Sequence, residues 1–196
     1  MKYYLSIDIS TSNAGFTVFD SGYKLADYRH LQLTIDKDTV KENKEYKKAE
    51  IFKKYLSEIK EQYPTIEAVN IEKSLISSNN INTATMLTSF NAICRYIILQ
   101  ELNIIPTQIT VSDSRKIFLA EHCINKKIKG VITSVLSFPA EFKDNKKEFI
   151  RQKVARLEPS IIWIYKKNGS ISDLSYDISD SYCVGYAGMI INNIKS

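Results

Sequence analysis

The stretch that most restricts the fold is residues 5–20, LSIDISTSNAGFTVFD, in which apolar and polar residues alternate in two short runs. Such alternation is typical of β-strands, and the connector STSNAG is rich in turn formers, with Asn13 and Gly15 able to adopt positive φ. The stretch therefore predicts a β-hairpin. Its first strand carries one charged residue, Asp8. A buried carboxylate without a partner is costly, so we expect either a cation near Asp8 or local exposure of the strand.

Helical and strand patterns alternate along the rest of the chain. We expect a third strand in 24–35, then a helix at 39–63, a strand at 67–73, a helix at 82–102, a strand at 108–112, helices at 114–123 and 144–159 around a less regular stretch, a short strand at 161–165 and a closing helix at 179–194. An antiparallel meander followed by βα units predicts an α/β fold with a mixed sheet flanked by helices. At 196 residues, we expect one domain, residues 1–196.

Four acidic residues lie at positions where their side chains can converge. Asp8 and Glu72 each lie on the polar face of a predicted strand, and Asp177 and Asp180, three residues apart, share a face of the closing helix. Each has a structural alternative: the helix pair can form a cap, Glu72 can end its strand in solvent, and Asp8 can bond to the following turn. Together they favour a divalent cation site, since Mg²⁺ binds through few carboxylates and keeps several waters.

Positive charge is concentrated in one segment of the chain. The net charge is +5, but residues 113–167 contain thirteen Lys and Arg against six Asp and Glu, so the remainder is slightly acidic. This asymmetry indicates either a polyanionic partner or a lysine-rich solvated surface.

The sequence carries no sign of a membrane span, a signal peptide or a disulfide framework. No segment reaches about 18 consecutive apolar residues, so we expect a soluble, intracellular protein. Cys94, Cys123 and Cys183 are far apart and show no CxxC spacing, and we interpret them as reduced packing residues.

Three short motifs, taken together and in order, resemble a known family. They are an Asp in the first strand followed by Ser-Thr and Gly (IDISTSNAG), a strand ending in Ile-Glu (NIEK) before a long helix, and a terminal Asp-x-x-Asp helix (DISD). The chain is similar, over almost its whole length, to the RuvC-type Holliday junction resolvases of the ribonuclease-H-like superfamily, with a spacing closer to a phage or viral branch. The resemblance implies a ribonuclease-H-like fold. It also implies a crossover junction endodeoxyribonuclease, a phosphodiester hydrolase of DNA recombination and repair that makes paired symmetric nicks in four-way junctions and leaves 5′-phosphates.

The resemblance also implies roles for individual residues. Asp8, Glu72, Asp177 and Asp180 are expected to be catalytic and to hold two Mg²⁺ or Mn²⁺ ions. The candidates for the basic residue near the scissile phosphate are Lys146 and Lys147, of which Lys147 is expected to be catalytic. The residues expected to bind DNA are Lys73, Arg115, Lys116, Lys146, Lys147 and Arg151.

Its expected partners are branched DNA and a second copy of the chain, with no membrane and no small-molecule cofactor. The homodimer is expected to use the helix at 82–102, which carries extra apolar residues such as Ile98 and Leu99, and to act in the cytoplasm of a cell or of a viral host.

Other functions remain open on the sequence alone. A different ribonuclease-H-like nuclease, acting on RNA–DNA hybrids or other branched DNA, would use the same carboxylates, whereas a non-catalytic nucleic-acid-binding module would not need four of them. An actin-like sugar or acetate kinase has a similar phosphate-binding hairpin. Such kinases need a second lobe with a glycine-rich phosphate loop, and neither is found in the sequence.

Overall fold

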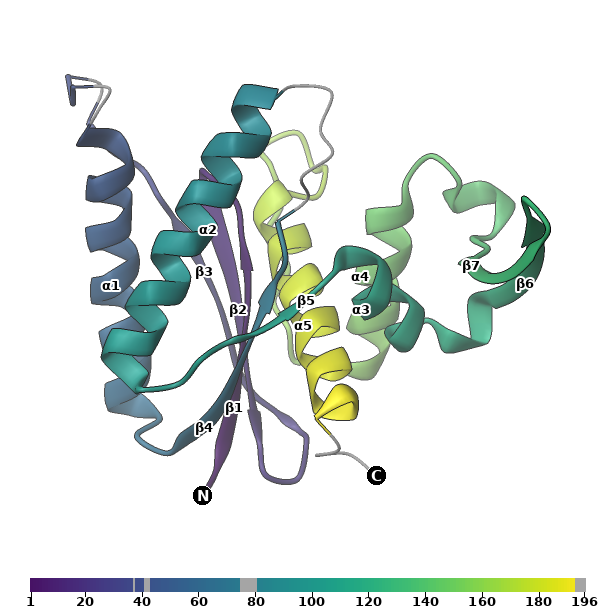
Figure 1. Ribbon diagram of the computed structural model, residues 1–196, viewed down its shortest axis with the longest axis horizontal. Coiled ribbons are helices and arrows are strands. Elements are labelled where there is room, and N and C mark those ends of the chain that lie inside the picture. The colour runs from purple at the N-terminus through teal and green to yellow at the C-terminus, as the bar shows by residue number, and fades with distance from the viewer. Residues whose placement is uncertain (37, 41–42, 75–80, 193–196) are drawn as a thin grey trace.

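A five-stranded mixed sheet forms the centre of the computed structural model, which describes residues 1–36, 38–40, 43–74 and 81–192 (Figure 1). The strand order is β3-β2-β1-β4-β5. Strands β1 to β3 form an antiparallel meander, and β4 and β5 run parallel to β1. The α/β fold predicted from the sequence is therefore confirmed. The strands are β1 (Tyr3–Ile9), β2 (Asn13–Asp20), β3 (Leu25–Gln32), β4 (Ile66–Glu72) and β5 (Thr107–Ile109).

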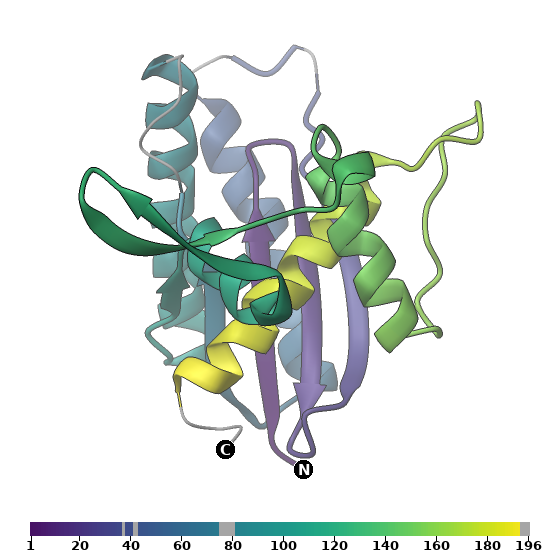
Figure 2. The ribbon, with the colours of Figure 1, turned by 90° about the vertical axis from the view of Figure 1, so that its right-hand side faces the viewer.

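Helices cover both faces of this sheet. Helices α1 (Lys44–Gln62) and α2 (Ile81–Leu102) lie on one face, and α5 (Asp173–Ile191) crosses the other (Figure 1, Figure 2). Helices α3 (Val111–Phe118) and α4 (Lys146–Leu157) pack against α5. Among the described residues, no helix has the length and apolar character needed to cross a lipid bilayer.

Between α3 and α4 the chain forms a second β-hairpin, where the sequence predicted only a less regular stretch. Its strands are exposed along most of their length, so the segment lacks the alternation that marks a half-buried strand. Its elements are η2 (Ala120–His122), β6 (Cys123–Ile128), β7 (Val131–Leu136) and η3 (Ala140–Phe142), of which η2 and η3 are single 3-10 turns.

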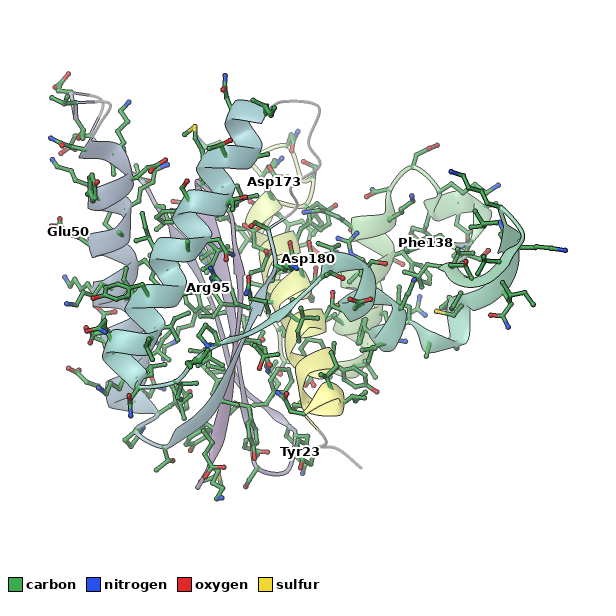
Figure 3. The ribbon with its side chains drawn as sticks, in the orientation of Figure 1. Tyr23, Glu50, Arg95, Phe138, Asp173 and Asp180 are labelled. Atoms are coloured by element: carbon green, nitrogen blue, oxygen red, sulfur yellow. The ribbon has the colours of Figure 1, made fainter. Side chains whose placement is uncertain are left out.

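Several predicted elements differ from those observed. The predicted helix at 114–123 is α3, which begins at Val111 and ends at Phe118, and Cys123 belongs to β6. Helix α5 begins at Asp173 after the N-cap Ser172, so it starts before the predicted 179 and Asp177 is not its cap (Figure 3 labels Asp173). The predicted strand at 161–165 makes only a single bridge, between Tyr165 and Ile171. Strand β5 is short because the Thr110 side chain accepts a hydrogen bond from the following turn and begins α3 there.

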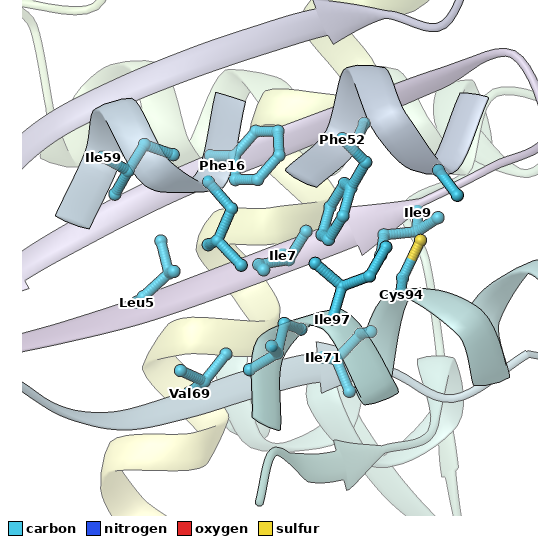
Figure 4. Packing of buried hydrophobic residues seen from close by; sticks show 14 of the residues in the cluster. Leu5, Ile7, Ile9, Phe16, Phe52, Ile59, Val69, Ile71, Cys94 and Ile97 are labelled. Atoms are coloured by element: carbon cyan, nitrogen blue, oxygen red, sulfur yellow. The ribbon is translucent and has the colours of Figure 1, made fainter. Parts of the chain in front are cut away.

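The main hydrophobic core lies between the sheet and the helix pair α1 and α2 (Figure 4). Leu5, Ile7 and Ile9 all point into this core, as the alternation in the sequence predicted, where they meet Phe52 of α1 and Ile97 of α2. A second cluster fills the space around α5 on the opposite face. The polar side chains of β1 therefore point toward α5.

Candidate active site

Two neighbouring parallel strands bring the first two carboxylates together. Ile7 of β1 is in register with Ile71 of β4, and both are buried in the core under α1 and α2. Successive side chains of a strand point to opposite faces, so Asp8 and Glu72 both lie on the α5 side of the sheet. The predicted alternation thus places the two acids side by side at the carboxyl ends of their strands.

A glycine allows α5 to approach these strands closely. Gly15 lies directly opposite Asp8 in the β1–β2 ladder. A Cβ atom at Gly15 would overlap the backbone carbonyl of Asp177 and lie 2.9 Å from the amide nitrogen of Ile178. The prediction that Gly15 serves the turn through a positive φ was therefore wrong. The residue lies within β2 and does not adopt positive φ, and a glycine is needed there because α5 lies so close. The hairpin turn is instead closed by Ser10, whose side chain accepts a hydrogen bond from the Asn13 amide at 2.9 Å.

The helix α5 contributes the other two carboxylates. Asp177 and Asp180 lie within its first half, one turn apart, and Figure 3 shows Asp180 below Asp173 on this helix. The side chain of Asp180 is only 6% exposed. One carboxylate oxygen of Asp177, Oδ2, is buried and has no hydrogen-bond partner.

Burial and mutual repulsion raise the pKa of three of these acids. The pKa of Asp8 lies well above its usual value because the carboxyl is buried and because Glu72 repels its charge. Burial, together with repulsion by Asp180, raises the pKa of Glu72 to about 7. Burial also raises the pKa of Asp177 to about 6, against the attraction of Lys147. The four carboxylates therefore share one electrostatic site with an excess of negative charge.

Two basic side chains partly neutralise the site. Arg115 Nη2 of α3 lies 3.1 Å from Asp180 Oδ1, and Lys147 Nζ of α4 lies 3.3 Å from Asp180 Oδ2. Although burial opposes their charged forms, attraction to Asp180 raises the pKa of both cations. Both remain charged at neutral pH. Lys147, one of the two candidates for the basic residue of the site, thus lies beside Asp180, whereas nothing in the sequence indicated that Arg115 would contact a carboxylate.

The residues present fit a divalent cation by their chemistry. Carboxylate oxygens are the ligands that Mg²⁺ and Mn²⁺ prefer, and the buried Oδ2 of Asp177 has no partner. As the side chains stand, no three acidic, histidine or cysteine groups in the described part of the chain are arranged to hold one ion. Both oxygens of Asp180 face protein cations instead. Metal binding would therefore require Asp180 to exchange part of this pairing for the ion.

The other basic residues predicted to bind DNA lie at different depths. Lys73 and Lys146 are exposed, and Lys146 Nζ lies 5.8 Å from the ring centre of Phe138. Lys116 is half-buried. Arg151 Nη2 lies 2.5 Å from Glu148 Oε1, so a carboxylate of the protein itself already neutralises the charge of this arginine.

A cavity of about 630 Å³ lies beside Lys147, between the start of α4 and the start of α5. Its lining includes Lys143, Lys146 and Tyr176, together with the acids Asp144 and Asp173. Lys143 belongs to the basic segment noted in the sequence, but the pattern did not single it out. The cavity places three lysines next to the carboxylate site.

These raised pKa values predict how stability depends on pH in EDTA. The folded protein holds a proton on Glu72 up to about pH 7, whereas the unfolded chain releases it near 4.5, so the free energy of unfolding should fall as the pH rises between these values. Denaturant titrations of wild type and Glu72→Gln at several pH values measure this. The stability of wild type relative to the variant should decrease across the interval. A difference that is constant, or that grows with pH, would contradict the shift.

Comparison with known proteins gives a likeness of fold. No protein-family model matches the chain, and no curated protein matches it in sequence. The structure of Thermus thermophilus RuvC with a Holliday junction substrate has a TM-score of 0.60 at 9% identity, and the match covers 98% of this chain and 96% of that one. A second T. thermophilus RuvC structure gives 0.58 at 10% identity, with the same coverage. Fowlpox virus resolvase with Holliday junction DNA gives 0.46 at 15% identity, covering 97% and 98%. The ribonuclease-H-like fold that the sequence resemblance implied is confirmed by the RuvC structures.

Proposed function

We propose that the chain is a metal-dependent, structure-selective endodeoxyribonuclease that resolves four-way DNA junctions by paired symmetric nicks and leaves 5′-phosphates. The observation that carries this proposal is the convergence of four carboxylates, from β1, β4 and α5, beside Lys147 in a RuvC-like fold. A purely structural role would not require four acids, one buried and three half-buried, that repel one another. Such sites are more often functional than structural.

The roles of the site residues follow from their chemistry. Asp8, Glu72, Asp177 and Asp180 would hold two Mg²⁺ or Mn²⁺ ions, which in such sites activate the attacking water and stabilise the leaving 3′ oxygen. Lys147, whose ammonium lies at the edge of the carboxylates, would bind an oxygen of the scissile phosphate. Arg115 would hold Asp180 in position from the opposite side.

The lysines beside the site suit a DNA backbone. Lys143, Lys146 and Lys147 line the adjoining cavity, and phosphate contacts of this kind supply much of the affinity of DNA-binding proteins. The RuvC structure with TM-score 0.60 was solved with a Holliday junction substrate. We infer that this chain also binds branched DNA, in the cytoplasm of its cell or of a viral host.

A panel of labelled substrates tests the proposed function. Purified protein with Mg²⁺ should nick a four-way junction at least tenfold faster than a flap, an RNA–DNA hybrid or a linear duplex of the same sequence. Faster cleavage of the hybrid or the flap would assign the chain to another ribonuclease-H-like activity. Equal rates on every substrate would reject structure selectivity.

Lysines 146 and 147 should contribute phosphate contacts to the complex. Changing both to Glu is expected to weaken junction binding and to reduce the slope of log K against log salt by about 2, at about 0.9 per phosphate contact. Anisotropy titrations at several salt concentrations measure this. The matched control changes Lys47 and Lys54 to Glu, two exposed lysines of α1 on the other face. An unchanged affinity and slope would show that the α4 lysines do not bind DNA.

We expect a homodimer, since two symmetric nicks are most simply made by two active sites related by a two-fold axis. Helix α2 remains the expected interface, but not through Ile98, which is buried in the main core against the sheet. The exposed apolar side chains of this helix carry the expectation instead, with exposed fractions of 78% for Ile81, 47% for Met86 and 63% for Tyr96. Light scattering should give a molar mass twice that of one chain. In Tyr96→Glu the measured mass should fall toward that of a single chain. A monomer in both the free and the junction-bound state would contradict this expectation.

A further inference from the structure

The β6–β7 hairpin projects from the molecule beyond α3 and α4 (Figure 1, Figure 2). Its two central turn residues, Lys129 and Gly130, both have positive φ, at 49° and 85°. Such a two-residue turn matches the right-handed twist of the flanking strands, so it favours a preformed hairpin. The base of the hairpin is fixed by Leu136, which packs against the cluster around α5, and by a 2.9 Å hydrogen bond from the Ser137 amide to the His122 carbonyl.

The end of this hairpin combines exposed apolar and basic side chains. The hairpin tip, residues 126–132, contains three lysines, and no acidic residue occurs anywhere in residues 123–136. Its exposed fractions include 46% for Ile128, 65% for Val131 and 73% for Ile132. Ile128 and Val131 are cross-strand partners and share one face of the hairpin, whereas Ile132 lies beside Lys127 on the other face. Exposed apolar side chains on both faces of a thin projection suggest an interaction site, because isolated exposure would need no explanation.

We propose that the hairpin tip binds DNA, with its lysines on backbone phosphates and its apolar side chains against base edges or a base step. This deepens the proposed function and rests on it for the identity of the DNA as an arm of a branched substrate. A two-stranded β-ribbon has the width that the DNA major groove admits, and proteins also insert Ile and similar side chains between base steps. Two hairpin tips packed together would bring six lysines into contact. The charge therefore fits a polyanion and not a second copy.

The place of the hairpin in the chain supports the same conclusion. It is inserted between α3 and α4, the helices that carry Arg115 and Lys147 to the carboxylates. DNA whose phosphate reaches Lys147 would therefore run close to the element that joins these helices. The hairpin would hold an arm of the substrate outside the site of cleavage.

Two sets of substitutions separate the charged and apolar contributions. One changes the three tip lysines to Gln, and the other changes Ile128, Val131 and Ile132 to Thr, which keeps a high strand propensity. Binding to a junction and to a linear duplex is measured by anisotropy in EDTA at several salt concentrations. The lysine set should weaken binding at least tenfold and reduce the salt slope by about 2 to 3. The apolar set should weaken binding about tenfold with little change in slope.

The matched control changes three exposed lysines elsewhere, Lys24, Lys47 and Lys54, to Gln, and should bind like wild type. Wild-type affinity and slope in both tip variants would overturn the proposal. Dissociation of a dimer by the apolar set, with unchanged DNA affinity, would overturn it in favour of a contact between copies. Hairpin-dependent DNA binding by a wild type that cleaves no junction would reject the proposed function and leave this inference standing.

Discussion

Replacing Asp8 with Asn is expected to slow junction cleavage by about a thousandfold while leaving junction binding intact. The substitution keeps the shape of the side chain but removes a carboxyl group that would bind the metal ion, close to the other three acids. Loss of about 4 kcal/mol of transition-state stabilisation gives this factor. Binding should persist, because the substitution leaves in place every basic side chain that faces the DNA phosphates. Mg²⁺-dependent nicking and gel-shift affinity, measured on the same preparation, check both parts.

The companion variants locate the ligands more closely. Glu72→Gln should behave like Asp8→Asn, and Glu50→Gln, an exposed acid on α1, should cleave like wild type. Normal nicking by the Asp8 or Glu72 variant would contradict a metal site at these acids. Normal nicking by only one of Asp177→Asn and Asp180→Asn would identify the other as the ligand. Ca²⁺ should support binding but little cleavage, because it accepts looser coordination than Mg²⁺.

Replacing Gly15 with Ala should disturb both the fold and the site. The added Cβ would meet the backbone of Asp177 and Ile178, which cannot move aside like a flexible side chain. Overpacking of this kind costs about 3 kcal/mol. Because relief of the overlap moves α5 away from Asp8, cleavage should fall by about a hundredfold even where the protein remains folded. Denaturant titration and nicking rates well below the melting temperature measure the two effects separately.

Gly22 provides the control for this substitution. It lies in the exposed β2–β3 turn, and an added Cβ would meet only the Asp20 side chain, at 3.2 Å. Gly22→Ala should therefore leave stability and cleavage close to those of wild type. A Gly15→Ala protein as stable and active as wild type would show that α5 does not depend on this contact.

The sequence predicted the parts of the site that depend on strand alternation. Leu5, Ile7 and Ile9 are every second residue of β1, which predicted that their face of the strand is buried in the core. Asp8 was therefore predicted to lie on the opposite face. The order of the family-like motifs then indicated which acids would converge, and the structure places Asp8 and Glu72 on neighbouring strands.

Features that depend on contacts between distant segments could not be predicted. Gly15 was assigned to a turn from its local sequence. The actual need for a glycine there is the close approach of α5, which is far away in sequence. The pairing of Arg115 with Asp180 leaves no local pattern for the same reason. The β6–β7 hairpin was missed because neither of its faces is buried, and hydrophobic periodicity reports burial.

The most direct test of the central claim maps the nicks that wild-type protein makes in a four-way junction labelled in turn on each strand. With Mg²⁺, cleavage should occur at symmetric positions on two opposed strands, and DNA ligase should reseal the products because they carry 5′-phosphates. Asp8→Asn should bind the same junction without cutting it. A folded wild type that binds the junction but makes no nick with Mg²⁺ or Mn²⁺ would contradict the assignment of these carboxylates as a nuclease centre.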